Sequence, residues 1–300
     1  MVLSLKARER AMAATIVEFF QRYPDDEACL AQVFEARFGQ GHICPNCERA
    51  AKWYRIKATR AFACQWCGWH LHPTAGTLFE DTRTPLRLWF YAIHLFTTSR
   101  HGVPAKELQR QLGVTYKTAW RMGHEIRKHM AAVDGDDPLS GTVEIDDVMI
   151  GGHRPGKPGR GAAGKTLMIG MVERDGEVMT KVVPNARKRT VHPIIEDGVA
   201  PGSTVYSDEL KSYDGLAAKG YEHEAVNHGR GEYVRGECHT NTIEGYWSRL
   251  KNSIRGTHVH VSGKHLQKYA GEFEYRYNRR KRPEKMADEL LSVFPPLDEE

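Results

Sequence analysis

Residues 142–150 read TVEIDDVMI, a run of β-branched and apolar side chains interrupted by acidic ones, and this run predicts a β-strand. Further strands are predicted by TLMIGMVE at 166–173, EVMTKVVP at 177–184 and STVYSDE at 203–209. The Gly-, Pro- and Arg-rich segment GGHRPGKPGRGAAGK at 151–165 is typical of a loop. A helical pattern then extends over 242–282, with a break near 256–263. These elements predict an α/β domain in the C-terminal half.

The N-terminal half has a mainly helical pattern. Apolar residues recur at three-to-four spacing over residues 16–34, and PLRLWFYAIHLF at 85–96 has the composition of a buried helix. A cysteine-containing segment at 42–71 separates the two helical stretches. We therefore expect the N-terminal half to consist of helices and a cysteine-containing segment, and so to differ in fold from the α/β domain.

The bulk composition is that of an ordinary globular chain of 300 residues with net charge +5 and a mean hydropathy of −0.55. No apolar run approaches the length of a membrane span, and the start MVLSLKARERAMAAT lacks the layout of a secretory signal. We therefore expect a cytoplasmic protein without a membrane partner.

Basic side chains are concentrated near the C-terminus. Residues 249–285 carry eleven Lys or Arg against three Glu, interleaved with tyrosines, histidines and a phenylalanine. An isolated basic run is usually a solvated helix face, but basic groups mixed with flat aromatic rings favour a phosphate backbone and unstacked bases. The stretch predicts DNA contacts, with Arg276, Arg279 and Arg280 among the candidates.

Four cysteines form two CxxC pairs, Cys44 with Cys47 and Cys64 with Cys67, separated by sixteen residues. Two such pairs supply the four thiolates of a tetrahedral zinc site, and this spacing lies in the zinc-ribbon range. Disulfides are the weaker explanation in a cytosolic chain. Four thiolates leave no open coordination position, so the predicted zinc is structural rather than catalytic.

Residues 103–121 have the residue pattern of a helix-turn-helix. A short helix would place Ala105, Leu108 and Leu112 inward, Gly113 would permit a sharp turn, and Thr115 would cap the second helix. That helix would present Tyr116, Lys117 and Arg121 outward, as a recognition helix does in a major groove. An ordinary pair of packed helices fits the same pattern, and the sequence leaves both interpretations open.

Three acidic residues are candidates for a catalytic metal site. Asp146 and Asp208 follow apolar runs, where each strand is expected to give way to a turn, and Glu244 lies early in a predicted helix. Three converging carboxylates suit two divalent cations about 3.5–4 Å apart, an arrangement used in phosphoryl transfer. Taken singly, each acid is more often a cap, a turn former or a surface charge.

Two choices within this set remain open. Adjacent strand residues face opposite sides, so we expect only one of Asp146 and Asp147 to be a ligand. Asn241 is an alternative to Glu244, but Glu244 carries charge and lies two helical turns before Lys251, so both would project from one helix face. Arg255 continues that face by another turn, which would suit a DNA strand lying along the helix.

Taken together, these motifs resemble those of bacterial insertion-sequence transposases of the DDE class, in the subgroup with an N-terminal zinc ribbon and a ribonuclease-H-like catalytic domain. The resemblance runs from about Glu27 to Arg280. It rests on the ribbon with the following HPTAGTLFEDTRTPLRLWF, and on VEIDDVMIGG, VYSDELKSYDGL, VNHGRGEYVRGECHTNTIEGYWSRLK and HVSGKHLQKYAGEFEYRYNRR.

The resemblance implies a domain order and a chemistry. The expected parts are a helical segment at 1–40, a four-cysteine zinc ribbon at 41–80, a helical region at 81–135 and a ribonuclease-H-like mixed sheet flanked by helices at 140–290. Asp146, Asp208 and Glu244 would hold Mg²⁺ or Mn²⁺ for cleavage and joining of DNA strands, and Lys251 would touch the transposon end. The implied partners are double-stranded inverted repeats and target DNA, bound by a homo-oligomer that pairs two ends.

Rival functions differ in what they leave unexplained. A DNA-binding regulator would need only the ribbon and the helix pair, and would leave the strand-borne acids without a role. A nuclease would use the same metal chemistry without rejoining the ends. A decayed copy of a transposase is disfavoured because all three acids are present.

Overall fold

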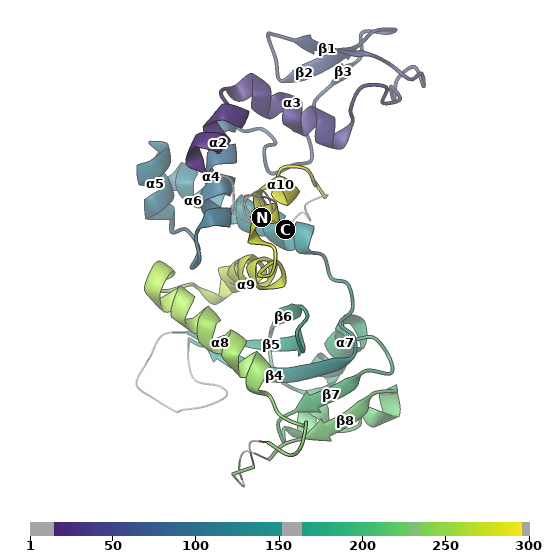
Figure 1. Cartoon of the computed structure of the whole chain (residues 1–300), viewed down its shortest axis with the longest axis vertical. Coiled ribbons are helices and arrows are strands. Elements are labelled where there is room, and N and C mark those ends of the chain that lie inside the picture. Colours follow the sequence, from purple (N-terminus) through teal and green to yellow (C-terminus); the bar gives the residue numbers. More distant parts are fainter. Residues whose placement is uncertain (1–14, 152–163, 228, 230, 233, 296–300) are drawn as a thin grey trace, which may run out of the picture. The chain divides into compact units, whose positions relative to one another are not determined.

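The computed structural model describes residues 15–151, 164–227, 229, 231–232 and 234–295. The chain divides into two compact units, one containing the residues up to Val133 together with those from Arg279 onward, the other spanning Asp134–Asn278 (Figure 1). Residues 1–14 of the predicted N-terminal segment and 152–163 of the predicted loop lie outside the described residues. Within the described ranges, no helix is both long and apolar enough to cross a lipid bilayer.

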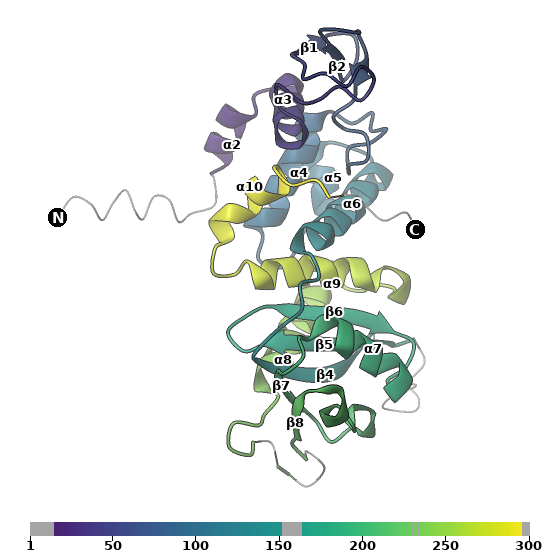
Figure 2. The same ribbon diagram turned by 90° about the vertical axis from the view of Figure 1, so that its right-hand side faces the viewer.

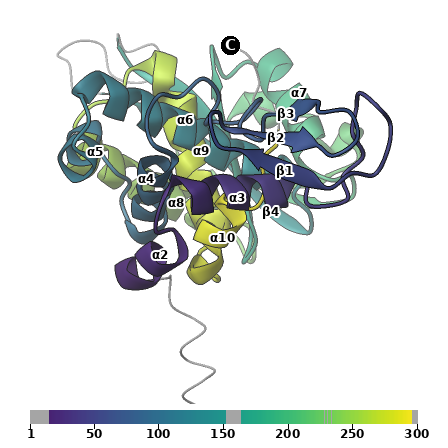
Figure 3. The same cartoon turned by 90° about the horizontal axis from the view of Figure 1, so that it is seen from above.

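The first unit begins with two short helices, α2 (Ile16–Arg22) and α3 (Asp26–Arg37). Thr15 caps α2, because its hydroxyl accepts a hydrogen bond from the Glu18 amide while the Glu18 carboxylate accepts one from the Thr15 amide. The antiparallel sheet β1 (Trp53–Ile56), β2 (Ala61–Cys64) and β3 (His70–Leu71) follows (Figure 3). Phe62 of β2 stacks on Phe34 of α3 with 4.1 Å between ring centroids, so the small sheet shares a core with the helix.

Three further helices complete the front of this unit: α4 (Leu86–Thr98), α5 (Ala105–Leu112) and α6 (Tyr116–Asp134). The turn between α5 and α6 has the predicted chemistry: Gly113 adopts φ 65°, and the Thr115 hydroxyl accepts from the Thr118 amide at 3.2 Å. The C-terminal elements η6 (Pro283–Lys285) and α10 (Met286–Leu290) also belong here. His129 of α6 donates to the Leu290 carbonyl at 2.8 Å.

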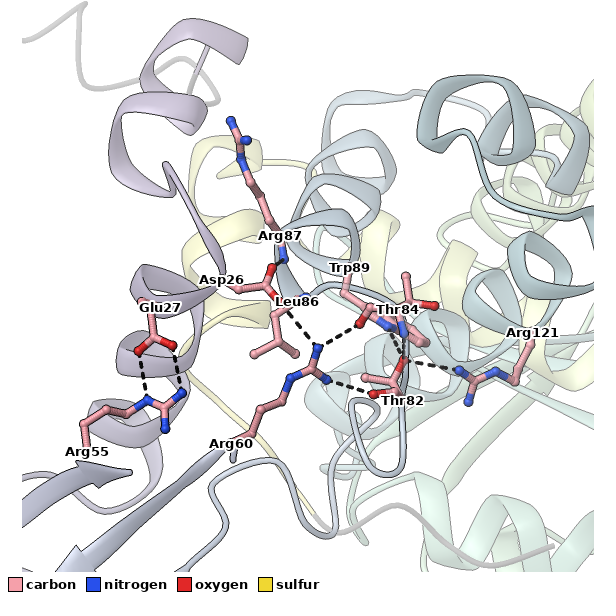
Figure 4. Close-up of polar contacts among 10 residues, drawn as sticks. All are labelled: Asp26, Glu27, Arg55, Arg60, Thr82, Thr84, Leu86, Arg87, Trp89 and Arg121. Carbon is pink, nitrogen blue, oxygen red and sulfur yellow. Dashed lines mark hydrogen bonds and ion pairs between the residues drawn. The ribbon is translucent and has the colours of Figure 1, made fainter. Parts of the chain in front are cut away.

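Polar contacts of Asp26 and Arg60 connect the ribbon to the helices (Figure 4). Pro85, the residue before α4, offers no side-chain cap, and the Asp26 carboxylate instead accepts hydrogen bonds from the amides of Leu86 and Arg87, both at 3.0 Å. Arg60 donates to the Thr82 carbonyl at 2.8 Å and also contacts Asp26. The start of α4 is thereby fixed by groups from α3 and from the turn between β1 and β2.

The second unit is built on a mixed sheet of β4 (Thr142–Ile150), β5 (Thr166–Glu173), β6 (Val178–Val183), β7 (Thr204–Ser207) and β8 (Glu222–Ala225). Its order is β6-β5-β4-β7-β8, with β4 antiparallel to β5 and parallel to β7. An antiparallel meander extended by parallel strands, with helices on both faces, is a ribonuclease-H-like arrangement. The predicted fold class is therefore confirmed, including the positions of the strands that the sequence indicated.

Helices cover both faces of this sheet (Figures 1 and 2). On one face, Val191 and Ile195 of α7 (Lys188–Gly198) pack in a cluster with apolar residues of β4, β5 and β7. On the other face, α8 (Asn241–Ser253) and α9 (Gly263–Asn278) pack in a second cluster that includes Val148 and Trp247. Between α8 and α9 lies the π-helical turn Ile254–His258, where the sequence predicts a break in the helix.

Candidate active site

The four ribbon cysteines face one another as a zinc site requires. Cys44 Sγ lies 3.7 Å from Cys67 Sγ, and Cys47 Sγ lies 3.8 Å from Cys64 Sγ. Sulfur atoms at the corners of a tetrahedron around zinc, with bonds of about 2.3 Å, are separated by roughly 3.8 Å. These distances are far longer than the ~2.05 Å of a disulfide. The four thiols therefore fit a structural zinc ion, in agreement with the predicted ribbon.

The acidic residues of the second unit gather where a parallel strand pair ends. β4 pairs with β7 as far as Ile145 opposite Ser207, so that Asp146 and Asp208 are the next residues along the two strands. Ligand oxygens of Asp146, Asp147 and Asp208 all lie within 4.8 Å of one another. Asp208 is held in place because its Oδ1 accepts from the Leu210 amide at 3.1 Å. Two of the predicted acids are thus neighbours.

One expectation about β4 was wrong. Asp146 does not end its strand, since β4 continues to Ile150; it is the neighbouring strand β7 that stops beside it. Alternation also led us to expect only one of Asp146 and Asp147 to be a ligand, and this stays a prediction; a carboxylate oxygen of Asp147 lies within 4.8 Å of those of Asp146 and Asp208. Because β7 has ended at this point, the two aspartates of β4 are half-exposed and can both lean toward Asp208. Strand alternation fixes the direction of the Cβ atom but not the end of a side chain.

The electrostatics of Asp146 reflect this crowding. Burial, followed by the charges of Asp208 and Asp147, raises the pKa of Asp146 to about 7, and Glu244 adds a smaller contribution in the same direction. Like-charged carboxylates that are partly withdrawn from water disfavour ionisation unless a cation neutralises them. The donor set consists only of oxygens, which is the chemistry that Mg²⁺ and Mn²⁺ prefer. The residues present therefore fit a divalent cation.

Glu244 occupies a different place from the aspartates. It is an exposed residue in the first turn of α8, and the Thr240 hydroxyl donates to its Oε1 at 3.0 Å. It is not among the residues whose oxygens lie within 4.8 Å of one another, although its charge acts on Asp146. The structure thus brings Asp146 and Asp208 together and leaves Glu244 beside them. Asn241, the alternative to Glu244 as the third ligand, begins the same helix and is exposed.

Lys251 belongs to α8, and Arg255 to the π-helical turn that follows it. Both line a pocket of about 250 Å³ together with His260 and apolar residues such as Ile150. Burial lowers the pKa of Lys251, and Arg255 adds to this effect, whereas the charge of Asp146 opposes it. A half-buried ammonium group next to a guanidinium group attracts an anion such as a phosphate.

The remaining candidate DNA contacts differ in their surroundings. Tyr116, Lys117 and Arg121 of α6 are all exposed, and Arg121 also contacts the Thr82 hydroxyl at 3.4 Å and lies over the Trp89 ring (Figure 4). The basic stretch 249–285 contains three further arginines that we predicted to contact DNA. Arg276 pairs with Glu272 at 2.9 Å, Arg279 pairs with Glu289 at 2.9 Å, and Arg280 is half-buried.

Two residues of this site were missed by sequence reasoning. Glu144, two positions before Asp146, is fully buried and bonded to α8. Gly170 pairs with Asp146 across β4 and β5 and lies under the Trp247 ring. The signals available in the sequence were an acid two residues before a candidate ligand in a predicted strand, and a glycine within a mainly apolar strand.

Comparison with known proteins gives consistent matches along the chain. Residues 138–278 match the ISXO2-like transposase domain, and residues 24–70 match the transposase zinc-ribbon domain. An uncharacterized protein in transposable element ISH50 of Halobacterium salinarum is 28% identical over 278 residues, covering 86% of this chain and 92% of that protein. An uncharacterized transposase-like protein of Haemophilus influenzae is 32% identical over 102 residues, covering 34% of this chain and 81% of that protein.

Solved structures show only slight overall likeness. The Mos1 strand transfer complex aligns with 67% of this chain and 75% of its own matched chain, at 12% identity and a TM-score of 0.30. A pre-cleavage Mos1 transpososome aligns with 68% and 79%, at 12% identity and a TM-score of 0.28. Likeness at this level supports no further conclusion.

Proposed function

The chain belongs to the ISXO2-like transposase family, and we propose that it cleaves transposon ends and joins them to target DNA by metal-dependent phosphoryl transfer. The observation that carries this proposal is the meeting of Asp146, Asp147 and Asp208 within 4.8 Å at the edge where β7 ends. Divalent cations, Mg²⁺ or Mn²⁺, would supply activation of the attacking oxygen and stabilisation of the leaving oxygen there. No protein nucleophile is required for this chemistry.

The protein's own groups have distinct tasks in this proposal. Asp146 and Asp208 would hold the cations with Asp147 as a further oxygen donor, and Glu244 at the start of α8 would complete the set. Lys251 binds a phosphate next to the scissile bond, because a half-buried ammonium group concentrates the negative charge of the strand near the carboxylates. Arg255 extends this positive edge along the DNA backbone.

Double-stranded DNA is the proposed partner of both units. The zinc ribbon and the exposed start of α6, with Tyr116 and Lys117, would bind the terminal repeats, while Arg121, Arg276, Arg279 and Arg280 would add contacts where their present partners release them. Zinc held by the four cysteines would keep the ribbon folded and take no part in the reaction. Pairing of two ends would require at least two copies of the chain.

Cleavage and joining assays on DNA that carries the element's own inverted repeats test this proposal. Asp146→Asn and Asp208→Asn are expected to abolish nicking in Mg²⁺ while retaining binding to the end in a gel-shift assay. Asp197→Asn, on the exposed side of α7, is the matched control and is expected to behave as the wild type. Normal cleavage by either active-site variant would refute the metal-site assignment.

The products distinguish the two rival functions. A transposase yields branched molecules in which the cut 3′ end is joined to a target plasmid, whereas a nuclease yields only cut ends. A regulator yields neither product, with or without Mg²⁺. Denaturing gels of a reaction with end-labelled DNA separate these outcomes in one experiment.

A further inference from the structure

Glu144 is a fully buried carboxylate on β4, with no exposed side-chain surface. Its Oε2 accepts hydrogen bonds from the amide of Thr242 at 2.7 Å and from the amide of Ile243 at 3.1 Å. Its Oε1 accepts from the Thr242 hydroxyl at 2.9 Å and from Nε of Arg174 at 2.8 Å. Three of these four donors belong to the first turn of α8.

These contacts act as the N-terminal cap of α8. The residue before the helix, Thr240, makes no side-chain capping hydrogen bond, so the amides of the first turn need another acceptor. Glu144 supplies it from a position 98 residues earlier than Thr242 in the chain. A carboxylate at a helix N-terminus is also favoured by the helix dipole.

Arg174 extends the same network to the segment that leads into α8. Besides its bond to Glu144, it donates to the Glu237 carbonyl at 2.7 Å and lies over the Tyr206 ring with 4.8 Å to the centroid. Tyr206 belongs to β7, two residues before Asp208. The network therefore contacts β4, which carries Asp146 and Asp147, β7, which leads to Asp208, and the helix that carries Glu244.

We propose that Glu144 is a positioning residue, which fixes the start of α8 so that Glu244 lies beside Asp146 and Asp208. The spacing carries this inference: Glu144 is two residues from Asp146 on the same face of β4, and Thr242 is two residues from Glu244. One carboxylate thus connects the strand that holds one ligand to the helix turn that holds another. The inference rests on the function proposed above for Glu244.

A purely stabilising role is the competing explanation. A buried ion pair is weak evidence for stability, because the cost of removing both charges from water offsets their attraction. Groups that orient metal ligands, by contrast, typically change metal affinity by about 10- to 100-fold when they are replaced. The two roles are separated by asking whether Glu144 acts through Glu244.

The test measures Mn²⁺ affinity of the full-length protein by electron paramagnetic resonance of free Mn²⁺, in a double-mutant cycle. Glu144→Gln keeps the shape of the side chain but removes its charge and one acceptor oxygen. We expect Glu144→Gln and Glu244→Gln each to weaken Mn²⁺ binding by ~10-fold, and the double variant to be no weaker than Glu244→Gln alone. The exposed Glu177→Gln, in the turn before β6, is the matched control and should bind Mn²⁺ as the wild type does.

Hydrogen exchange gives a readout that does not depend on the proposed function. The amides of Thr242 and Ile243 are expected to exchange faster in Glu144→Gln than in Glu177→Gln, because a neutral amide oxygen is a weaker acceptor than a charged carboxylate oxygen. If Glu144→Gln does not fold, as judged by circular dichroism, Thr242→Val replaces it, since it removes only the hydroxyl donor. For Thr242→Val we expect a loss of Mn²⁺ affinity smaller than that expected for Glu144→Gln, together with faster exchange of the Ile243 amide. If both the Mn²⁺ affinity and the exchange rate of Thr242→Val equal those of the wild type, the proposal is overturned.

Other outcomes overturn the positioning role in distinguishable ways. If Glu244→Gln weakens Mn²⁺ binding while Glu144→Gln does not, the positioning role alone fails and the function of Glu244 stands. Additive effects in the double variant show that Glu144 acts independently of Glu244, which also overturns the proposal. If Glu244→Gln itself leaves Mn²⁺ binding unchanged, the proposed ligand role fails first, and the inference fails with it.

Discussion

The indole ring of Trp247 lies so close to Gly170 that a Cβ atom at Gly170 would be 2.4 Å from Cζ2 of the ring. Gly170 is the β5 partner of Asp146, and Trp247 is one turn further along α8 than Glu244. The absence of a side chain on Gly170 therefore permits α8 to approach the sheet directly beside the candidate metal site. The distance between Asp146 and the helix of Glu244 depends on this contact.

Gly170→Ala tests whether this approach is needed. The added methyl group forces the rigid ring or the strand to shift, so we expect a loss of ~1–3 kcal/mol in the free energy of unfolding and a clear loss of cleavage. Gly245→Ala is the matched control within α8, because nothing lies within 4 Å of its added Cβ, and it should raise stability by roughly 0.5–1 kcal/mol. Thermal unfolding and DNA nicking measure both variants; equal behaviour of the two would contradict the close-approach argument.

The pH dependence of metal binding follows from Asp146. Its pKa is raised to about 7 by burial and by Asp208, so half of the metal-free molecules carry a proton there near neutral pH. A cation must displace this proton, and Mn²⁺ affinity is expected to fall by up to ~10-fold for each pH unit below 7. Above pH 8 the affinity should level off. Titrations from pH 5.5 to 8.5 check this, and a flat profile below pH 7 would refute it.

Protonation of Glu274 is expected to make the free energy of unfolding depend on pH, separately from metal binding. Burial raises the pKa of this α9 carboxyl to about 8, Asp134 adds to the shift, and a hydrogen bond from Thr180 opposes it. The folded protein therefore binds a proton that the unfolded chain releases near pH 4.5, so this contribution to stability is lost as pH rises from about 4.5 to 8. Glu274→Gln should remove this loss and melt above the wild type at pH 8.5. A lower melting temperature for the variant at that pH would contradict the sign.

Removal of zinc should affect the first unit selectively. Each chain is expected to carry one zinc ion in native mass spectrometry, and Cys67→Ser or a strong chelator should release it. The ribbon strands β1–β3 should then lose protection in hydrogen exchange, because a segment of this size cannot hold a core without the metal. Protection of β4 and β5 should be unchanged. Retained protection in β1–β3 after zinc loss would show that the ribbon folds without metal.

Much of the fold was readable from local patterns. Short runs of β-branched and apolar residues indicated the strands of the second unit, and Gly113 with Thr115 indicated the turn between α5 and α6, because backbone conformation and capping are local properties. The cysteine spacing was sufficient for the ribbon, since two CxxC turns restrict how four thiolates can meet.

The site itself depended on contacts that no local pattern records. Whether Asp147 reaches Asp208 is decided by the point at which β7 stops, and this is a property of strand register. The role of Glu144 depends on hydrogen bonds to a helix about a hundred residues away. Pairings of this kind arise from tertiary packing, so the sequence could offer Asp146 and Asp208 as candidates but could not indicate Glu144 or Gly170, which contact or face α8.

The most direct test of the shared metal site is anomalous X-ray scattering from crystals of the full-length protein soaked in Mn²⁺. We predict a manganese peak bonded to carboxylate oxygens of both Asp146 and Asp208, which is lost in Asp208→Asn and retained in the surface variant Asp197→Asn. A well-ordered site with both aspartates in place and no manganese between them would contradict the account.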